Sequence, residues 1–444
     1  MADHALSAGR QRISVAWVDL AVRLAYHRSV HYGLLDSPLM VRSGEFLSPF
    51  LFSPAAQQML LRPDDPAPSQ HDPARDAGDP PGERPHRVLI VCHSSWTFID
   101  RVKADLSEHT DLEFRSVDVS TLPFPERPSH GLAIRMRGAW NRTQRLHPVP
   151  DQMKEPLRWA DTVLVEWGTF PFAWFSFLDL SDYGLRVVAR IHRFEILTPY
   201  PLLARSAAYD AIGFVAFPIR SLITSISPRA EQVGELPILQ NIHDLRPFSP
   251  ADEKDRFRLV QIGWALPIKD VSFSLTLLRQ LREQDERYVL TLIGPTLEDA
   301  TSPYTAQWST QVAAQIEDLG PGVEILGYRS DVAEILASSG YILSSSRAEG
   351  THEAVAEGAA AGCIPVVRDW PEIAPWGGAG MVYPRSWISS SVQEAVDRIR
   401  AFQAPDAFDR ESAACRAWVL GSRDRATIRQ DYVDFLIGRH DHDS

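Results

Sequence analysis

The chain has 444 residues, of which 44% are hydrophobic and 23% are charged, a composition typical of globular proteins. One ordinary core does not accommodate this length, so two domains with an appendage are expected. The formal net charge of −12 disfavours a general nucleic-acid binder. The cysteines (Cys92, Cys363 and Cys415) are not at metal or redox spacing, which predicts reduced thiols in a cytoplasmic protein.

Residues 1–61 form a first block, which is expected to be helical. Apolar residues recur at helical spacing between Ile13 and Leu24. No apolar segment suits a signal peptide, and no apolar run is long enough to span a bilayer as a helix. The polar face of the helix includes Asp19 and is not strongly basic, so we expect it to pack on the first domain. The alternative is peripheral contact with the inner face of a membrane.

Residues 62–85 read as a linker, because they hold seven prolines and five aspartates with no large apolar side chain. Beyond it, short apolar runs alternate with helical segments over residues 86–245. This alternation predicts a parallel sheet covered by helices on both faces. The expected strands are 86–94, 112–119, 161–167, 185–192 and 211–217.

The same pattern starts again over residues 246–422, which predicts a second domain of the same α/β class. Its expected strands are 258–263, 289–294, 323–327, 340–346 and 364–369. Residues 423–444 form a last segment, whose helix at about 423–438 is expected to cross back to the first domain.

The segment Ser344–Ile364 places two carboxylates, Glu349 and Glu357, with seven residues between them. The helix around Glu357 reads "AVAEGAAAG", which is too small and apolar for a solvated face. A carboxylate buried there needs hydrogen-bond partners. A pair of ribose hydroxyls would serve, and so would a structural partner such as an arginine. The residue alone does not decide between them.

Other features of the second domain suit an anionic ligand. Gly263 ends a strand and permits close approach to the backbone. Lys269 precedes a helix, where its charge adds to the helix dipole to make a phosphate site, although a solvated surface lysine is the simpler interpretation. Free N–H groups near Gly350 can bind hydroxyl-rich or anionic groups, and ordinary capping by Thr351 is the alternative.

Together these motifs resemble the retaining nucleotide-sugar glycosyltransferases of the GT-B fold, glycosyltransferase family 4 in particular. The segment "EGTHEAVAEGAAAGCIPVV" is similar to that family's pair of glutamates and the strand after it. "VQIGWALPIKD" is similar to its glycine-to-lysine segment, and "PILQNIHDLRPFSP" to its interdomain connector. The resemblance covers about residues 86–435 and is strongest in the second half. It implies two Rossmann-like domains that face each other across a cleft.

The resemblance also implies roles for individual residues. Glu357 would hold the ribose hydroxyls, and Lys269 would stabilise the departing diphosphate. Glu349, with the backbone of Gly350–His352, would contact the donor sugar, and His192 would face that sugar from the first domain. The implied catalytic residues are Glu349, His192 and Lys269, and the implied donor-binding residues are Gly263, Lys269, Arg347, Gly350, Thr351, His352 and Glu357.

The implied function is hexosyl transfer from a nucleoside-diphosphate sugar to a saccharide or lipid-linked acceptor, as in polysaccharide biosynthesis. Negative charge grows on the departing diphosphate, and preorganised cations stabilise it. No Asp-x-Asp pair is placed to hold a metal, so neither a metal nor another cofactor is expected. The alternatives are a catalytically weak GT-B scaffold or a nucleotide-sugar epimerase or phosphorylase. A dinucleotide oxidoreductase is disfavoured, because no G-x-G-x-x-G follows a strand.

The sequence departs from the family at two points. Trp264 stands where the family usually has an arginine beside the diphosphate. The candidates to replace that arginine are Arg347, Arg193 and Arg190. The first loop, "CHSSWTFID", has no glycine where the family usually has two. An aromatic stripe of Phe170, Trp174 and Phe177 is expected to be core, with an acceptor groove as the alternative.

Overall fold

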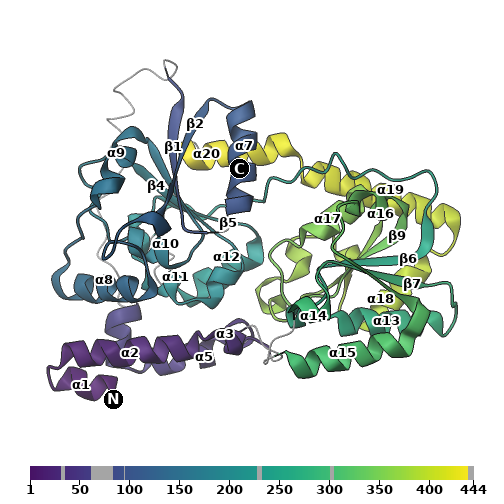
Figure 1. Cartoon of the computed structure of the whole chain (residues 1–444), viewed down its shortest axis with the longest axis horizontal. Coiled ribbons are helices and arrows are strands. Elements are labelled where there is room, and N and C mark those ends of the chain that lie inside the picture. The colour runs from purple at the N-terminus through teal and green to yellow at the C-terminus, as the bar shows by residue number, and fades with distance from the viewer. Residues whose placement is uncertain (32–35, 62–83, 95, 228–232, 301–304, 439–444) are drawn as a thin grey trace. The chain divides into compact units, whose positions relative to one another are not determined.

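The computed structural model describes residues 1–31, 36–61, 84–94, 96–227, 233–300 and 305–438. These residues divide into two compact units (Figure 1). The first unit comprises the described residues of Met1–His27, Arg42–Ile242 and Ala426–Ser444. The second unit comprises those of Arg28–Val41 and His243–Arg425. Most of the expected linker 62–85 lies outside the described residues.

A five-stranded parallel sheet, in the order β2-β1-β3-β4-β5, forms the centre of the first unit. Its strands are β1 (His86–Cys92), β2 (Leu112–Asp118), β3 (Thr162–Glu166), β4 (Arg186–Ile191) and β5 (Ala211–Phe214). Its helices are α1 (Ala2–Ser7), α2 (Gln11–Ala25), α5 (Ser43–Leu51), α6 (Pro54–Ala56), α7 (Trp96–His109), α8 (His130–Thr143), α9 (Asp151–Trp159), α10 (Phe170–Phe175), α11 (Tyr200–Leu203), α12 (Phe217–Ile226) and α20 (Arg425–Ile437).

The core of the first unit follows from its apolar strands. All described residues of β3 and β4 are buried, as expected for central strands covered on both faces. The last helix, α20, buries Tyr432, Phe435 and Leu436 in this core. Helix α20 therefore packs on the first sheet, although the residues directly before it belong to the second unit.

Helix α2 packs on the first unit through a narrow face made of Ser14, Val18 and Val22. Asp19 fixes the helix to α8, because its Oδ1 lies 3.0 Å from Nε2 of His130. The spacing from Ile13 to Leu24 correctly predicted this helix. However, Ile13, Leu20 and Leu24 are among the exposed large hydrophobic side chains of the chain.

A six-stranded parallel sheet, in the order β11-β10-β9-β6-β7-β8, forms the centre of the second unit (Figure 1). Its strands are β6 (Asp255–Ile262), β7 (Val289–Ile293), β8 (Val323–Gly327), β9 (Ser339–Ser344), β10 (Ile364–Arg368) and β11 (Ile388–Ser389). Its helices are α3 (Arg28–His31), α4 (Pro38–Val41), α13 (Val271–Arg282), α14 (Leu297–Ala300), α15 (Ala306–Leu319), α16 (Val332–Ser338), α17 (Glu353–Ala360), α18 (Val392–Ala401) and α19 (Pro405–Ser422).

These two parallel sheets with covering helices confirm the predicted α/β class. The strand β11 was not predicted, because two residues are too short for a periodic signal. The block of residues 1–61, expected as one extension, is divided between the units, since Leu39 and Met40 are buried in the second. Among the described residues, none of the helices has the length and apolar character needed to cross a lipid bilayer.

Candidate functional site

Lys269 and Glu349 form an ion pair in the second unit. Lys269 ends a short 3-10 turn after β6, and Glu349 lies in the loop between β9 and α17. The Lys269 Nζ atom lies 2.6 Å from Glu349 Oε1, and Ser346 Oγ donates a hydrogen bond to the same oxygen at 2.6 Å. Because β6 and β9 are neighbours, the pair lies at the carboxyl edge of the sheet, where open parallel sheets bind ligands.

Two glycines keep the backbone beside this pair uncrowded. Gly263 follows β6 with φ of +71°, and Gly294 follows β7 with φ of +116°. A Cβ atom on Gly294 would lie 3.3 Å from the Gly263 nitrogen, and one on Gly263 would lie 3.8 Å from Cε of Lys269. The left-handed φ values and this close approach favour glycine at both positions.

The loop Gly350–His352 leads directly into helix α17, whose N-terminal end carries partial positive charge. His352 has φ of +49°, and its Nδ1 lies 2.6 Å from Ser344 Oγ. Burial, with the neighbouring charge of Lys269, lowers the pKa of His352 to about 4. His352 is therefore neutral at pH 7. Tyr383 donates a hydrogen bond to the carbonyl oxygen of Thr351 at 2.6 Å, which further fixes the loop.

Arg347 lies in the same loop, and two carboxylates hold its side chain. Its Nη2 atom lies 2.6 Å from Asp36 Oδ1 and 2.7 Å from Glu372 Oε1. Its backbone N–H donates to the carbonyl oxygen of Ile268 at 2.8 Å, next to Lys269. The structure therefore places Arg347 in the loop of the candidate site and already paired. Sequence reasoning did not anticipate either partner.

Glu357 lies on α17 with its side chain 19% exposed, so it is less buried than the sequence suggested. Its Oε1 atom lies 2.8 Å from Nε2 of His243. His243 belongs to the segment "NIHD" and stacks on Phe248, with ring centroids 6.3 Å apart. The protein partner of Glu357 is thus a histidine rather than an arginine. The motif around His243 was identified, but nothing in its spacing indicated this contact.

Trp264 does not occupy a position that a ligand could reach in place of the missing arginine. Its side chain is 1% exposed and packs in the core of the second unit with Val271 and Leu275. Trp264 is buried because helix α13, which follows it, packs an apolar face against the sheet.

His192, the catalytic residue expected from the first domain, follows β4 in the first unit. Its Nε2 atom lies 3.0 Å from Glu166 Oε1, and Arg190 Nη2 lies 2.6 Å from the same oxygen. Burial and the charge of Arg190 lower the pKa of His192. Its backbone N–H donates to Glu195 Oε1 at 2.9 Å. His192 is therefore a fixed and mainly neutral imidazole at pH 7.

An aromatic cluster surrounds His192, and we name Phe98, Trp167, His192 and Phe194 the aromatic platform. Trp167 stacks on His192 with centroids 4.0 Å apart, while Phe98 and Phe194 lie 5.9 and 5.3 Å from Trp167. Phe98 is 41% exposed and Phe194 is 36% exposed. Trp167 has φ of +70°, a strained value for a bulky side chain that is often found at functional sites.

The sequence did not lead us to predict the aromatic platform. We considered the stripe of Phe170, Trp174 and Phe177 instead. Trp174 is 2% exposed and Phe177 is fully buried, which confirms that these two residues belong to the core, whereas Phe170 is only partly buried. A usable signal existed, since Trp167 and Phe194 lie within two residues of the ends of predicted strands. Polar groups are also buried nearby. Within the described chain, neither Trp167 Nε1 nor Glu195 Oε2 has a hydrogen-bond partner.

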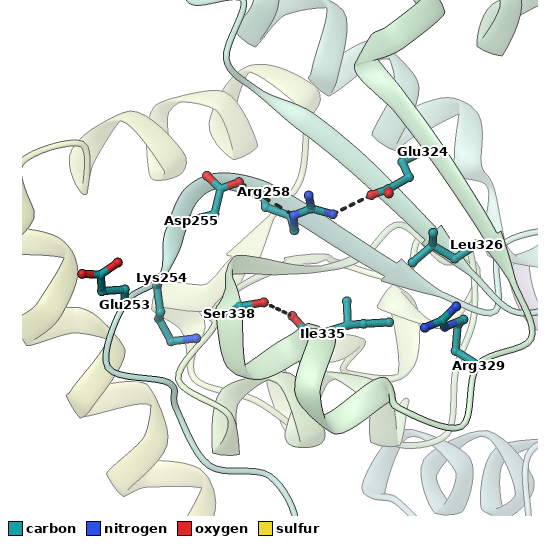
Figure 2. Close-up of a pocket in the computed structure, with 9 residues that line it drawn as sticks. All are labelled: Glu253, Lys254, Asp255, Arg258, Glu324, Leu326, Arg329, Ile335 and Ser338. Atoms are coloured by element: carbon teal, nitrogen blue, oxygen red, sulfur yellow. Dashed lines mark hydrogen bonds and ion pairs between the residues drawn. The ribbon is translucent and has the colours of Figure 1, made fainter.

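A large hollow of the second unit lies elsewhere (Figure 2). Its volume is about 650 Å³, and charged side chains dominate its lining. Asp255 and Arg258 belong to the first half of β6, and Glu324 to the start of β8, so these residues lie toward the amino ends of their strands. Arg258 is paired with Glu324. We therefore do not assign donor binding to this hollow.

In the parts of the chain that the structure describes, no three His, Cys, Asp or Glu side chains are grouped so that they could hold a metal ion.

Part of the second unit matches a known protein family. Residues 256–401 match the family model described as Glycosyl transferases group 1, which confirms the resemblance found in the sequence. No curated protein sequence matches the chain.

Solved structures are similar in fold at low sequence identity. Alr3699/HepE from Anabaena is 13% identical with a TM-score of 0.59, and the match covers 80% of this chain and 100% of that one. Sucrose-phosphate synthase from Thermosynechococcus elongatus is 11% identical with a TM-score of 0.56, over 80% and 100% of the two chains. TarM from S. aureus is 12% identical with a TM-score of 0.51 over 62% of this chain, which spans only 54% of TarM. These similarities confirm the GT-B fold.

Proposed function

We propose that the chain transfers a hexosyl group from a nucleoside-diphosphate sugar to a saccharide or lipid-linked acceptor, and the match of residues 256–401 to the family model Glycosyl transferases group 1 supports this. The Lys269–Glu349 pair at the carboxyl edge of the second sheet carries this proposal. Lys269 supplies a cation for the departing diphosphate, and Glu349 supplies acceptor oxygens for sugar hydroxyls. Polysaccharide biosynthesis is the proposed setting.

Uridine diphosphate is the first nucleotide to test. Structural neighbours were solved with UDP, with UDP-glucose and with UDP-2-fluoro glucose. In this chain, Glu357 would accept hydrogen bonds from the two ribose hydroxyls while His243 orients its carboxylate. The backbone of Gly263 and Gly350–His352 would lie against the donor.

We propose that transfer is metal-independent and retains the anomeric configuration. Lys269 and the N-terminal end of α17 supply positive charge where the diphosphate leaves, which is the role that a metal ion plays in other enzymes. The stereochemical part of the proposal rests only on the resemblance of the sequence to retaining glycosyltransferases.

The experiment that tests the proposal is calorimetric titration of the full chain with UDP, GDP, ADP and TDP in EDTA. Micromolar binding of one nucleotide supports a metal-independent donor site and selects the donor for turnover assays. Absence of binding to all of them would favour the catalytically weak scaffold. Incubating the chain with the selected sugar nucleotide in the absence of an acceptor distinguishes an epimerase from a glycosyltransferase. An epimerase forms its product without an acceptor.

We propose that the aromatic platform of the first unit binds the acceptor through the apolar face of a sugar ring. Aromatic faces stack on sugars, and the exposed rings of Phe98 and Phe194 offer such faces. The platform follows strands β3 and β4, at the carboxyl edge of the first sheet.

Replacing Phe194 by alanine should raise the acceptor KM by about tenfold and leave nucleotide affinity unchanged, because one stacking face is lost. Acceptor kinetics at saturating donor measure this. Phe124→Ala is the matched control, since Phe124 is 87% exposed in the same unit and is not part of the aromatic platform. Equal KM values for the two variants would refute the assignment.

We propose that the chain is cytoplasmic and contacts a membrane surface through helix α2. Ile13, Leu20 and Leu24 are 48%, 44% and 64% exposed on this helix. Arg12 precedes Ile13 on this helix and complements anionic lipid headgroups, whereas Arg23 is paired with Asp19. The three free cysteines agree with a reducing compartment.

Replacing Leu20 and Leu24 by serine should lower binding to vesicles that contain phosphatidylglycerol at least threefold, because apolar area is lost from the interface. Vesicle flotation measures this, with Ile325→Ser as the control at a similarly exposed apolar residue outside α2. A wild-type chain that stays unbound would exclude the membrane contact. A drop in self-association instead would identify a second copy as the partner.

A further inference from the structure

A short segment from the N-terminal block is built into the second unit, next to the candidate donor site. Ser37 and Leu39 are fully buried, and Met40 is 1% exposed. The Ser37 N–H group donates to Glu372 Oε2 at 3.3 Å, and Trp376 Nε1 donates to the carbonyl oxygen of Met40 at 2.9 Å. These contacts hold the segment Asp36–Val41 in place, so the residue at its start has a defined position.

The residue at the start of this segment is Asp36. Asp36 and Glu372 both form ion pairs with Arg347. Both carboxylates contact the same guanidinium nitrogen, at 2.6 and 2.7 Å. The three side chains together carry one positive and two negative charges. Glu372 is deeply buried and is tied to Arg347 through a backbone hydrogen bond of 3.0 Å as well. The Asp36 side chain is 62% exposed, so it is the carboxylate that can leave at low cost.

Glu372 already pairs with Arg347, so Asp36 brings a second negative charge to the same guanidinium. The Asp36 carboxylate contacts Arg347 in the loop that carries Glu349, and the backbone of Arg347 is hydrogen-bonded to Ile268, next to Lys269. A nucleoside diphosphate brings at least two further negative charges to the turn that ends at Lys269. The charge of Asp36 and the charge of a donor bound there therefore repel each other.

We propose that Asp36 sets the donor affinity of this protein by occupying Arg347 in the absence of donor. The Asp36 carboxylate takes the place of a donor phosphate, and binding requires that Arg347 exchange one anion for the other. This inference rests on the proposed donor site. Asp36 lies outside the segment 256–401 that matches the family model, but by this inference it acts directly on the donor site.

The test compares the wild-type chain, Asp36→Asn and Asp318→Asn by calorimetric titration with UDP and GDP in EDTA. Asp318 is a matched control, because its Oδ2 lies 2.6 Å from Arg279 Nη2 in the same unit and its side chain is 66% exposed. Removing Asp36 should tighten nucleotide binding about 5- to 20-fold, whereas Asp318→Asn should match the wild type. Added salt should shrink the gain, because it screens the charge that was removed.

Thermal unfolding of the three proteins separates a role in affinity from a role in folding. If nucleotide affinity is equal or weaker in Asp36→Asn while the wild-type chain binds, the inference is wrong and the proposed function stands. In that case, a lowered Tm would identify Asp36 as a structural anchor of the segment. If neither protein binds any nucleotide, the donor site itself fails and the inference fails with it. Binding by Asp36→Asn alone would support both.

Discussion

Replacing Glu357 by alanine should weaken nucleoside-diphosphate binding about 100-fold or more. Two hydrogen bonds from ribose hydroxyls to a carboxylate contribute about 1.5–3 kcal/mol each, and both are lost in this variant. The change also leaves His243 without the carboxylate that lies 2.8 Å from its Nε2 atom. Calorimetric titration of the folded variant with the nucleotide selected for the wild-type chain measures the effect.

Two further variants make the Glu357 result specific. Glu334→Gln removes the charge of an exposed glutamate on α16 of the same unit and should bind like the wild-type chain. His243→Ala keeps the carboxylate but removes the group beside it, so affinity should fall about three- to tenfold. Wild-type affinity in Glu357→Ala would exclude the ribose assignment. The Glu357–His243 pair would then be a structural contact of the second unit.

The strands of both sheets except β11 could be predicted from the sequence, because buried parallel strands read as short apolar runs. The α/β class and the GT-B resemblance follow from that alternation and from the segment around Glu349 and Glu357. Lys269 and Glu349 were singled out separately, and their contact depends on β6 and β9 being neighbours. No local pattern specifies such a long-range pairing.

The side-chain partners were the least predictable part. Asp36 lies more than 300 positions from Arg347 in the chain, and His243 lies more than 100 positions from Glu357. These contacts depend on how loops and the N-terminal segment dock, which hydrophobic periodicity does not encode. Burial decides other cases. Trp264 stands at the position where the family usually has a diphosphate-binding arginine, yet its side chain packs in the core because α13 buries its apolar face there.

Replacing Lys269 by methionine should lower kcat about 100- to 1,000-fold, with a smaller effect on donor affinity. The charge on the diphosphate grows as the sugar bond breaks, so a cation positioned there stabilises the transition state more than the ground state. Methionine keeps an unbranched chain of similar length but has no charge. Release of nucleotide from the sugar donor, with the acceptor or with water, measures the rate.

Lys154→Met is the matched control for Lys269. The Lys154 Nζ atom also lies 2.6 Å from a carboxylate, that of Asp151, but this pair is on an exposed helix of the first unit. Its loss should leave the rate unchanged, because surface ion pairs contribute little. A double change of Lys269 and Glu349 separates two explanations for a slow enzyme. If Glu349→Gln restores the rate of Lys269→Met, the defect comes from an unpaired carboxylate, and Lys269 has no direct role in the departure of the diphosphate.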